Sequence, residues 1–493
     1  MKKLGIAILL FVVALAVCGL LVVVAFQPPD PATPISGEFV LEGVTVVNPG
    51  SSETRQARIV VRNGVISEID NEVSGATDDT DIAKRFTGAY VLPGLIDMHT
   101  HLPPANILEL TPYFLLLQLS HGVTSVREAG DVDGTGTPAA KEGIATGVFP
   151  GPRIFSAGPF VTTGEARWPN SILLDSPADA RDAVEEILDE GHTVIKSYEN
   201  LTVEMLRALE VAADEMGLEI MGHVPDDLVY EDALIRDVQH FLGVPQPEKL
   251  SAHGMLDRIV DWSSVDEARM DQIVDATLEH DLANTPTLVS LRRVGEYKSF
   301  SAVYDDPTLT LLPDFYLSVV WHPERGVPVY RGLDTSFFVK QEDALSKKKR
   351  LVKKLHDTGA RLHLGTDTQQ PFVVPGASMH EEMVLFAEAG VPIEAIWKYA
   401  TTDSGESLKL AGLGTLKKGA PADMLIFREN PVQDLNALDT LEAIVADGRL
   451  YMKNDLDKKV DEFRDHYESF PVKQLAAFFA QRAVDKAAQN FTN

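Results

Sequence analysis

The stretch VLPGLIDMHTHL, residues 91–102, decides how the rest of the chain is interpreted. Its apolar residues predict a short buried strand, and side chains two positions apart on a strand point to the same face. His99 and His101 therefore share one face near the end of that strand. Two imidazoles on one face can bind a divalent metal ion. A His-x-His pair is common by chance, but the Pro-Gly-apolar-apolar-Asp sequence before this pair makes it far more specific.

Outward from this stretch, short apolar runs alternate with helical segments. The segments PADARDAVEEILDEG and TVEMLRALEVAADEMG have the periodicity of helices with one buried face. Alternation of this kind is typical of a parallel sheet covered on both faces, and eight strands predict an α/β fold with a closed (β/α)8 barrel over residues 91–405. The predicted strands are GLIDMH, GVTSVRE, RIFSAG, TVIKSY, EIMGHV, DVQHFL, ANTPTLV and RLHLGTD.

Two β-rich segments flank the predicted barrel. Residues 37–90 alternate apolar and polar side chains and contain Asn63-Gly64, a strong hairpin signal. Residues 406–455 return to the same pattern. We expect both segments to form one small β-sandwich, and residues 456–493 to form a charged helical tail.

Residues 1–36 are expected to be a membrane anchor and a linker. Lys2 and Lys3 precede an uncharged apolar run, residues 4–26, which is long enough to cross a bilayer core of about 30 Å. The positive-inside rule then places the remaining chain on the extracytoplasmic, periplasmic side. Two alternatives remain: a signal peptide cleaved after Ala25, and a lipoprotein modified at Cys18.

Composition restricts the kinds of partner and site. The chain has 493 residues, with 73 acidic against 44 basic side chains and a net charge of −29. Such a surface repels phosphate backbones, so we expect no nucleic-acid partner. Cys18, inside the apolar run, is the sole cysteine in the sequence. Any metal must therefore be bound by His, Asp, Glu or a modified Lys.

Several further segments resemble one family. VLPGLIDMHTHL resembles the strand-1 signature of the amidohydrolase superfamily. HTVIKSYENLT, GHVPDD and VQHFLG resemble its strands 4, 5 and 6. TPTLVSLRR resembles strand 7 of a prolidase-like and imidazolonepropionase-like branch, and HLGTDTQQPFVVPGASMHEEM resembles strand 8 with its loop. With GTLKKGAPADMLIF near the C-terminus, the resemblance covers about residues 38–452.

The resemblance implies six metal ligands and two divalent metal ions. Four would bind the more buried ion, and two histidines would bind the outer one together with a bridging lysine. That lysine would be a carbamate formed with CO2, since an ammonium has no lone pair to offer a cation. Zn2+ is the expected metal, although Mn2+ and Co2+ suit the same ligands. The buried-site ligands are His99, His101, Lys196 and Asp367; the outer-site ligands are His223, His240 and again Lys196.

Three features outside this ligand set are expected to face the substrate. Tyr198 lies two residues beyond Lys196 and would share its face on a strand, and His380 matches a histidine that the family has after strand 8. Residues 291–340 are longer than a barrel connection requires and are rich in aromatic residues, which is typical of a loop over a site.

The implied function is metal-dependent hydrolysis of a carbon–nitrogen bond, with Asp367 as general base. A small amide, a cyclic amide or an Xaa-Pro-type dipeptide is the expected substrate. A mononuclear deaminase of the same superfamily is one alternative, but the glutamate usual near its strand-5 histidine is replaced here by the sequence HVPDD. An inactive membrane-anchored scaffold is another, but none of the six ligands is missing. A homo-oligomer remains open.

Overall fold

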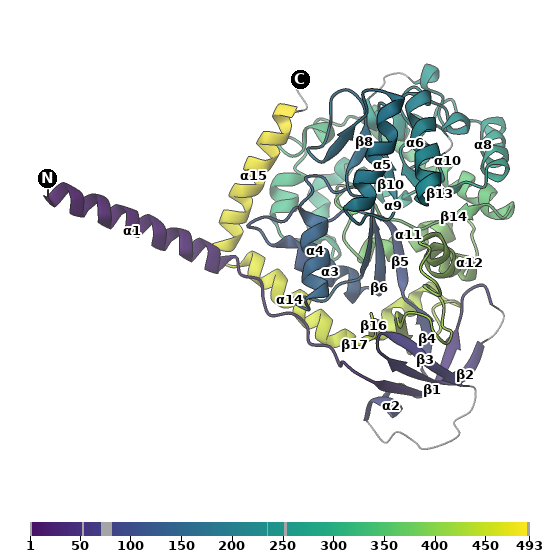
Figure 1. The fold of residues 1–493 in the computed structure, drawn as a ribbon, viewed down its shortest axis with the longest axis horizontal. Helices are drawn as coiled ribbons and strands as arrows, with labels where there is room; N and C mark the ends of the chain where they lie inside the picture. Colours follow the sequence, from purple (N-terminus) through teal and green to yellow (C-terminus); the bar gives the residue numbers. More distant parts are fainter. Residues whose placement is uncertain (1, 52–53, 71–80, 234, 251–253, 491–493) are drawn as a thin grey trace.

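The computed structural model describes residues 2–51, 54–70, 81–233, 235–250 and 254–490. Figure 1 shows a sheet at one end of the molecule, parallel strands surrounded by helices beside it, and three helices from the two termini.

Strands from both ends of the chain form one sheet of seven strands, in the order β17-β16-β15-β4-β1-β2-β3. Asn63 and Gly64 join β2 to β3 with φ of 51° and 78°, the left-handed conformation that a two-residue hairpin turn requires. Both predicted β segments therefore contribute strands to this sheet. Among the described residues their strands form a single sheet, and a two-sheet sandwich stays a prediction. The strands are β1 (Phe39–Val47), β2 (Thr54–Arg62), β3 (Val65–Asp70), β4 (Tyr90–Pro93), β15 (Met424–Phe427), β16 (Leu441–Ala446) and β17 (Arg449–Met452).

The parallel strands form two further sheets, and each of the eight predicted runs contributes a strand. The sheet orders are β5-β6-β7 and β14-β13-β12-β11-β10-β8-β9. Backbone hydrogen bonds of 2.9 Å link the two sheets: the Met98 amide of β5 donates to the Leu364 carbonyl beyond β14, and the Thr193 amide before β10 donates to the Ser156 carbonyl of β7. The strands are β5 (Leu95–Thr100), β6 (Val123–Glu128), β7 (Arg153–Ser156), β8 (Phe160–Thr162), β9 (Ser171–Leu173), β10 (Ile195–Ser197), β11 (Ile220–Gly222), β12 (Asp237–Gln239), β13 (Ala283–Thr285) and β14 (Arg361–Leu362).

Helices cover these strands and start and stop where the sequence signals predict. Thr202 caps α6 (Val203–Met216) by accepting a hydrogen bond from the Met205 amide, and Gly217 ends it with φ of 79°. The other quoted helix is α5 (Ala180–Asp189). The remaining helices of this region are α3 (Leu110–Ser120), α4 (Gly136–Ala145), α7 (Met255–Val260), α8 (Glu267–Glu279), α9 (Leu288–Val294), α10 (Thr335–Asp357), α11 (Ala377–Glu388), α12 (Ile393–Lys398) and α13 (Ser404–Ser407). The short α2 (Asp81–Arg85) instead lies beside β1 of the seven-stranded sheet.

The segment that resembles strand 7 is only partly a strand. β13 ends at Thr285, and Leu288–Val294 is α9, because Thr287 adopts φ of 47° and turns the chain. The long connection that follows, residues 291–340, mixes buried, half-buried and exposed residues, and several of its aromatic rings are among the buried ones. Tyr297 and Trp321 pack against Phe372 with ring centroids 4.8 and 5.4 Å apart, so much of this segment serves as a packed cover.

Three helices come from the chain ends. The apolar α1 (Lys2–Ala25) projects away from the body, and residues Ile8–Ala25 are long and apolar enough to cross a membrane, as in an anchor or a signal sequence. α14 (Lys453–Glu468) and α15 (Val472–Asn490) confirm the predicted helical tail.

Candidate metal centre

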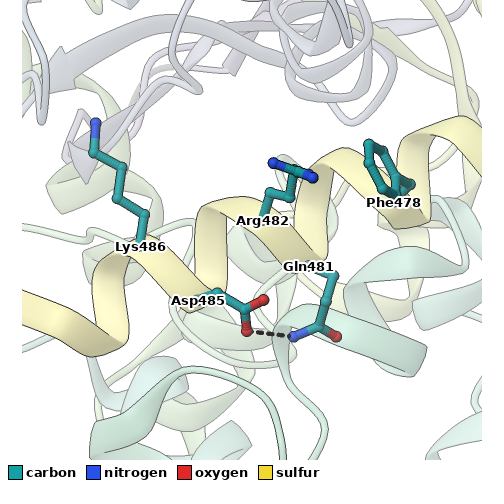
Figure 2. Close-up of a pocket in the computed structure, with 5 residues that line it drawn as sticks. All are labelled: Phe478, Gln481, Arg482, Asp485 and Lys486. Atoms are coloured by element: carbon teal, nitrogen blue, oxygen red, sulfur yellow. Dashed lines mark hydrogen bonds between the residues drawn. The ribbon is translucent and has the colours of Figure 1, made fainter.

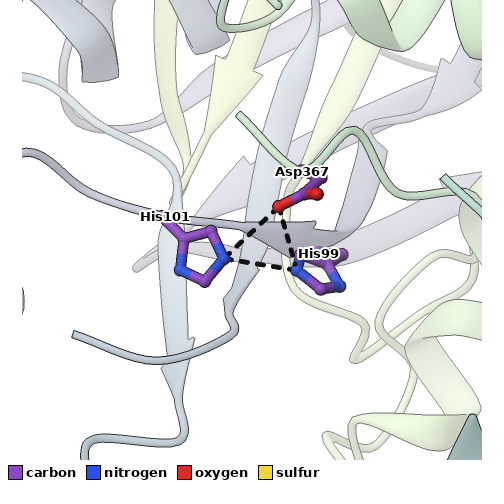
Figure 3. Close-up of side chains that lie close together, drawn as sticks. All are labelled: His99, His101 and Asp367. Atoms are coloured by element: carbon purple, nitrogen blue, oxygen red, sulfur yellow. Dashed lines mark hydrogen bonds and ion pairs between the residues drawn. The ribbon is translucent and has the colours of Figure 1, made fainter. Parts of the chain in front are cut away.

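His99 of β5 and His101, directly after this strand, meet the aspartate that follows β14. His99 Nε2 lies 3.3 Å from His101 Nε2, and both nitrogens lie 3.4 Å from Asp367 Oδ1 (Figure 3). The backbone brings the strands together at this point, since the Asp367 amide donates a 2.7 Å hydrogen bond to the His99 carbonyl. The ligand atoms of the three residues all lie within 4.8 Å of one another, a spacing that one cation can bridge.

A buried carboxylate fixes the two chain segments that carry these ligands. Asp97 accepts hydrogen bonds from the His99 amide at 3.1 Å, the Thr366 amide at 3.0 Å and the Thr366 hydroxyl at 2.6 Å. Burial raises the pKa of Asp97 to about 6, although these hydrogen bonds favour its charged form. Asp97 therefore ties the end of β5 to the segment leading to Asp367.

The histidines that follow β11 and β12 extend the cluster. His240 Nδ1 lies 3.9 Å from Asp367 Oδ2 and 2.6 Å from the Thr287 hydroxyl. The His240 ring lies 4.7 Å from the His99 ring and 5.1 Å from the His223 ring, centroid to centroid. The four imidazoles thus form a continuous group of ring contacts beside Asp367.

Lys196, in the middle of β10, is almost fully buried, and its ammonium donates a hydrogen bond to the Gln239 carbonyl oxygen. Burial lowers the pKa of Lys196 to about 7, although the negative charge of Asp367 acts to raise it. A neutral amine has the lone pair that reaction with CO2 requires, so this environment suits the predicted carbamate.

Burial also sets the protonation of the histidines. It lowers the pKa of His99 and His223 well below the usual value and that of His240 to about 3, and the nearby charge of Lys196 lowers all three further. Burial acts the same way on His101, but Asp367 and Glu128 outweigh it and raise its pKa to about 9.

The donor set fits a divalent cation. The neutral imidazoles of His99, His223 and His240 offer lone pairs. The surrounding histidines outweigh the burial of Asp367, so its pKa lies well below the usual range and it stays anionic. The buried Nδ1 atoms of His99 and His223 have no hydrogen-bond partner among the described residues. Buried polar atoms are rarely left without a partner, so these two mark places where a ligand can bind.

Comparison with known proteins agrees with this geometry. A family model described as the amidohydrolase family matches residues 90–450. The chain belongs to the amidohydrolase family. Amidohydrolases, as the name says, hydrolyse carbon–nitrogen bonds, and the prediction of a hydrolase is confirmed at the level of the family.

Solved structures show the same fold at low sequence identity. A bottromycin amidohydrolase is 22% identical with a TM-score of 0.66, covering 90% of this chain and 92% of that one. A Xaa-Pro dipeptidase with bound methionine is 20% identical with a TM-score of 0.60, covering 84% of this chain and 100% of that one. Among curated proteins, the adenine deaminase of Lysinibacillus sphaericus is 33% identical over 93 residues, which are 19% of this chain and 15% of that protein.

Of the two residues expected to bind substrate in this amidohydrolase, one lies against the metal-ligand cluster and the other bonds elsewhere. Tyr198 lies against the centre: its ring stacks on His223 at 4.7 Å, and its hydroxyl accepts a 3.1 Å hydrogen bond from the Trp168 indole. His380 bonds the backbone carbonyl of His121 at 2.8 Å. Among the described residues, no interaction joins the His380 side chain to the metal-ligand cluster.

The long aromatic connection reaches the centre at one point. The Tyr330 hydroxyl donates a 2.5 Å hydrogen bond to Gln370, three residues beyond Asp367. Burial raises the pKa of Tyr330, and the negative charge of Asp367 adds to the shift.

Two groups of this amidohydrolase were not predicted as part of the site. Glu128 Oε1 lies 3.8 Å from His101 Nδ1, while its buried Oε2 has no hydrogen-bond partner among the described residues. Its position beside Arg127 at the end of β6, one strand from His101, was the available signal. Lys348 of α10 donates a 2.9 Å hydrogen bond to the His240 carbonyl.

Proposed function

We propose that this amidohydrolase cleaves the carbon–nitrogen bond of a small amide, a cyclic amide or an Xaa-Pro-type dipeptide. The convergence of four histidines, Lys196 and Asp367 at the ends of parallel strands supports this most directly. Small neutral or zwitterionic amides suit a chain with a net charge of −29 better than polyanions do.

The six side chains divide into two sets of ligands. His99, His101 and Asp367 would hold one divalent ion, and His223 with His240 a second. Lys196, as a carbamate, would bridge them. When bound, two divalent ions would acidify a water between them and polarise the scissile carbonyl. Zn2+ is the metal we expect, with Mn2+ and Co2+ compatible with the same donors.

Asp367 would carry the proton transfer. Its carboxylate lies at the centre of the cluster, and the surrounding histidines keep it ionised. It would accept a proton from the attacking water and then deliver that proton to the leaving nitrogen. Tyr198, stacked on His223, and Tyr330, bonded to Gln370, would border the substrate and help to exclude bulk water.

Metal content tests the two-ion site directly. We expect about two ions for each full-length wild-type chain and one or none for Lys196→Ala. Lys353→Ala is a matched control, because Lys353 is exposed on α10 and pairs with Asp357. Hydrolysis of Xaa-Pro dipeptides and cyclic amides should disappear on chelation and return with added Zn2+, Mn2+ or Co2+.

A mononuclear deaminase is the second candidate, supported by the short stretch of 33% identity with adenine deaminase. It predicts one ion for each chain, unaffected by Lys196→Ala, and release of ammonia from an aminopurine. An inactive scaffold predicts no turnover with either substrate class.

The architecture and location that accompany this function are also proposals. We infer that the two linked parallel sheets are the wall of a (β/α)8 barrel over residues 91–405, flanked by the halves of the terminal β unit at 37–90 and 406–455. The uniformly apolar α1 would be an uncleaved anchor followed by a linker to residue 36, with the barrel on the extracytoplasmic side.

A further inference from the structure

The apolar helix α1 leaves the body beside the two C-terminal helices. Phe26, directly after α1, is buried, and its ring lies 6.3 Å from the ring of Phe479 in α15. Val22 and Ala25 also pack against the main core. The last turn of α1 is thus joined to α15, and α15 runs across the direction of α1 instead of continuing along it (Figure 1).

α15 has two different faces. Its buried face is a stripe of small apolar residues that pack on the body, Val472, Ala476, Ala480 and Val484. The opposite stripe is exposed and has the same helical spacing, Gln474, Phe478, Arg482 and Lys486. A helix that lies flat on a bilayer commonly combines aromatic and basic side chains in this way.

The exposed residues near the exit of α1 include two aromatic rings. Phe470, in the corner between α14 and α15, is 84% exposed, and Phe478 is 50% exposed. Most large apolar side chains outside α1 are more buried than this. Aromatic side chains are enriched where a membrane protein enters the headgroup region, because part of a ring can be buried there at low cost.

Basic groups accompany these rings although the whole chain is strongly acidic. The guanidinium of Arg482 lies over the Phe478 ring, 4.8 Å from its centroid. Arg482 and Lys486 extend into a hollow of about 500 Å³ (Figure 2). The nearby acid Asp485 accepts a 2.9 Å hydrogen bond from Gln481. Two cations against one carboxylate make this face locally positive on a molecule of net charge −29.

We propose that the outer face of α15, together with Phe470, is a membrane-contact surface that lies in the headgroup region of an anionic bilayer. Phe470 and Phe478 would enter the interface, while Arg482 and Lys486 would bind lipid phosphates. This inference rests on the proposed anchor role of α1, because a spanning α1 would place the α14–α15 corner at the bilayer surface. It adds a second, peripheral contact that fixes how the barrel sits on the membrane.

The experiment uses the full-length chain in lipid nanodiscs that hold one chain each, so that a second copy cannot cover α15. Cys18→Ser removes the native cysteine, and Gln474→Cys carries a nitroxide on the exposed stripe without altering Phe478. The accessibility of the nitroxide to oxygen reports its contact with lipid, and its accessibility to an aqueous nickel chelate reports its contact with water. Val211→Cys on α6 and Val339→Cys on α10 are matched controls, because both residues are exposed. Their helices lie on the far side of the body from α1 (Figure 1).

In anionic discs we expect the oxygen-to-nickel accessibility ratio at position 474 to exceed that at positions 211 and 339 severalfold. Phe478→Ser should lower the ratio at position 474 in any lipid. The pair Arg482→Glu and Lys486→Glu should lower it in anionic discs and much less in zwitterionic discs. Equal ratios at all three positions would overturn the proposal.

Alkaline carbonate washing of membranes separates this inference from the anchor itself. If the labelled Gln474→Cys chain is retained in the membrane but its nitroxide is exposed to water, the α15 surface is overturned and the anchor is left intact. Chain that washes off overturns both.

Discussion

The buried ammonium of Lys348 donates a 2.9 Å hydrogen bond to the backbone carbonyl of His240, a proposed ligand of the outer metal. Lys348 is 1% exposed, and its charge lies over the Trp262 ring, 5.3 Å from the centroid. His240 and Phe241 adopt φ of 60° and 55°, which is costly for residues other than glycine. Lys348 therefore helps to hold His240 in the backbone conformation that directs its ring to the centre.

Lys348→Met should weaken metal binding at the outer site and lower turnover. Loss of groups that orient a metal ligand typically lowers metal affinity or activity by about 10- to 100-fold. Titration of the apoprotein with Zn2+, together with kcat at saturating metal, measures both effects.

The matched control is Lys349→Met, because the neighbouring Lys349 is only half-buried and pairs with the exposed Glu388. Equal metal affinity in the two variants would show that the Lys348–His240 hydrogen bond does not support the site.

Tyr198→Ala should lower kcat/KM while metal content stays near that of the wild type. The Tyr198 ring covers His223 without being one of the metal-binding groups, so its loss should affect substrate and water exclusion more than metal affinity.

His380→Ala is the matched comparison, since both residues were predicted to bind substrate. Because His380 bonds the His121 carbonyl, we expect a stability loss of about 1 kcal/mol and an unchanged KM. A raised KM in His380→Ala with an unchanged melting temperature would reverse this assignment.

Local sequence patterns predicted the parts of the site that come from strand ends. His99 and His101 stand at the end of one apolar strand, and Asp367 follows another apolar run. Because the ends of parallel strands meet at the same edge, these three residues could be expected to lie together. The two β segments at the chain ends carried hairpin signals and do share a sheet. The link between the two parallel sheets was less predictable, because it depends on single hydrogen bonds such as that from Met98 to Leu364.

Groups that support the ligands from other elements were harder to predict. Lys348 lies in the run Lys347-Lys348-Lys349, which looks like a solvated helix face. Its spacing from Ala344 and Leu351, both on the buried face of α10, was a usable signal. The contact of His380 with His121 joins residues 259 positions apart, so no local pattern could reveal it.

Asp367→Asn should reduce turnover by about 100- to 10,000-fold, because the amide cannot accept the proton of the attacking water. The variant also removes the carboxylate that lies 3.4 Å from both His99 and His101, so metal content should fall. We would measure kcat and bound metal in the same preparation. Asp357→Asn, at an exposed pair with Lys353, should change neither. Turnover within a few-fold of wild type would exclude Asp367 as the general base.

Arg127→Met should destabilise the fold by about 3–5 kcal/mol, because it leaves a buried carboxylate without its cation. Arg127 Nη2 lies 2.6 Å from Asp237 Oδ2, and both side chains are buried. Denaturant unfolding at neutral pH measures the loss. Arg181→Met, which breaks an exposed pair with Glu215, should cost no more than about 1 kcal/mol.

The cost of Arg127→Met should also depend on pH. Burial alone would raise the pKa of Asp237, but Arg127 and His363 outweigh it and hold the pKa below the usual value. In the wild type, ionised Asp237 therefore adds stability above its unfolded pKa of about 4, and this contribution is lost as the pH falls through the lower folded pKa.

Without Arg127 the folded pKa of Asp237 rises, so the variant regains stability relative to wild type as the pH falls and that carboxylate binds a proton. The difference in unfolding free energy should be largest near neutral pH and shrink towards about pH 4. A difference that stays constant over this range would assign the loss to packing and to the 2.8 Å hydrogen bond between Arg127 and the Met98 carbonyl instead of the ion pair.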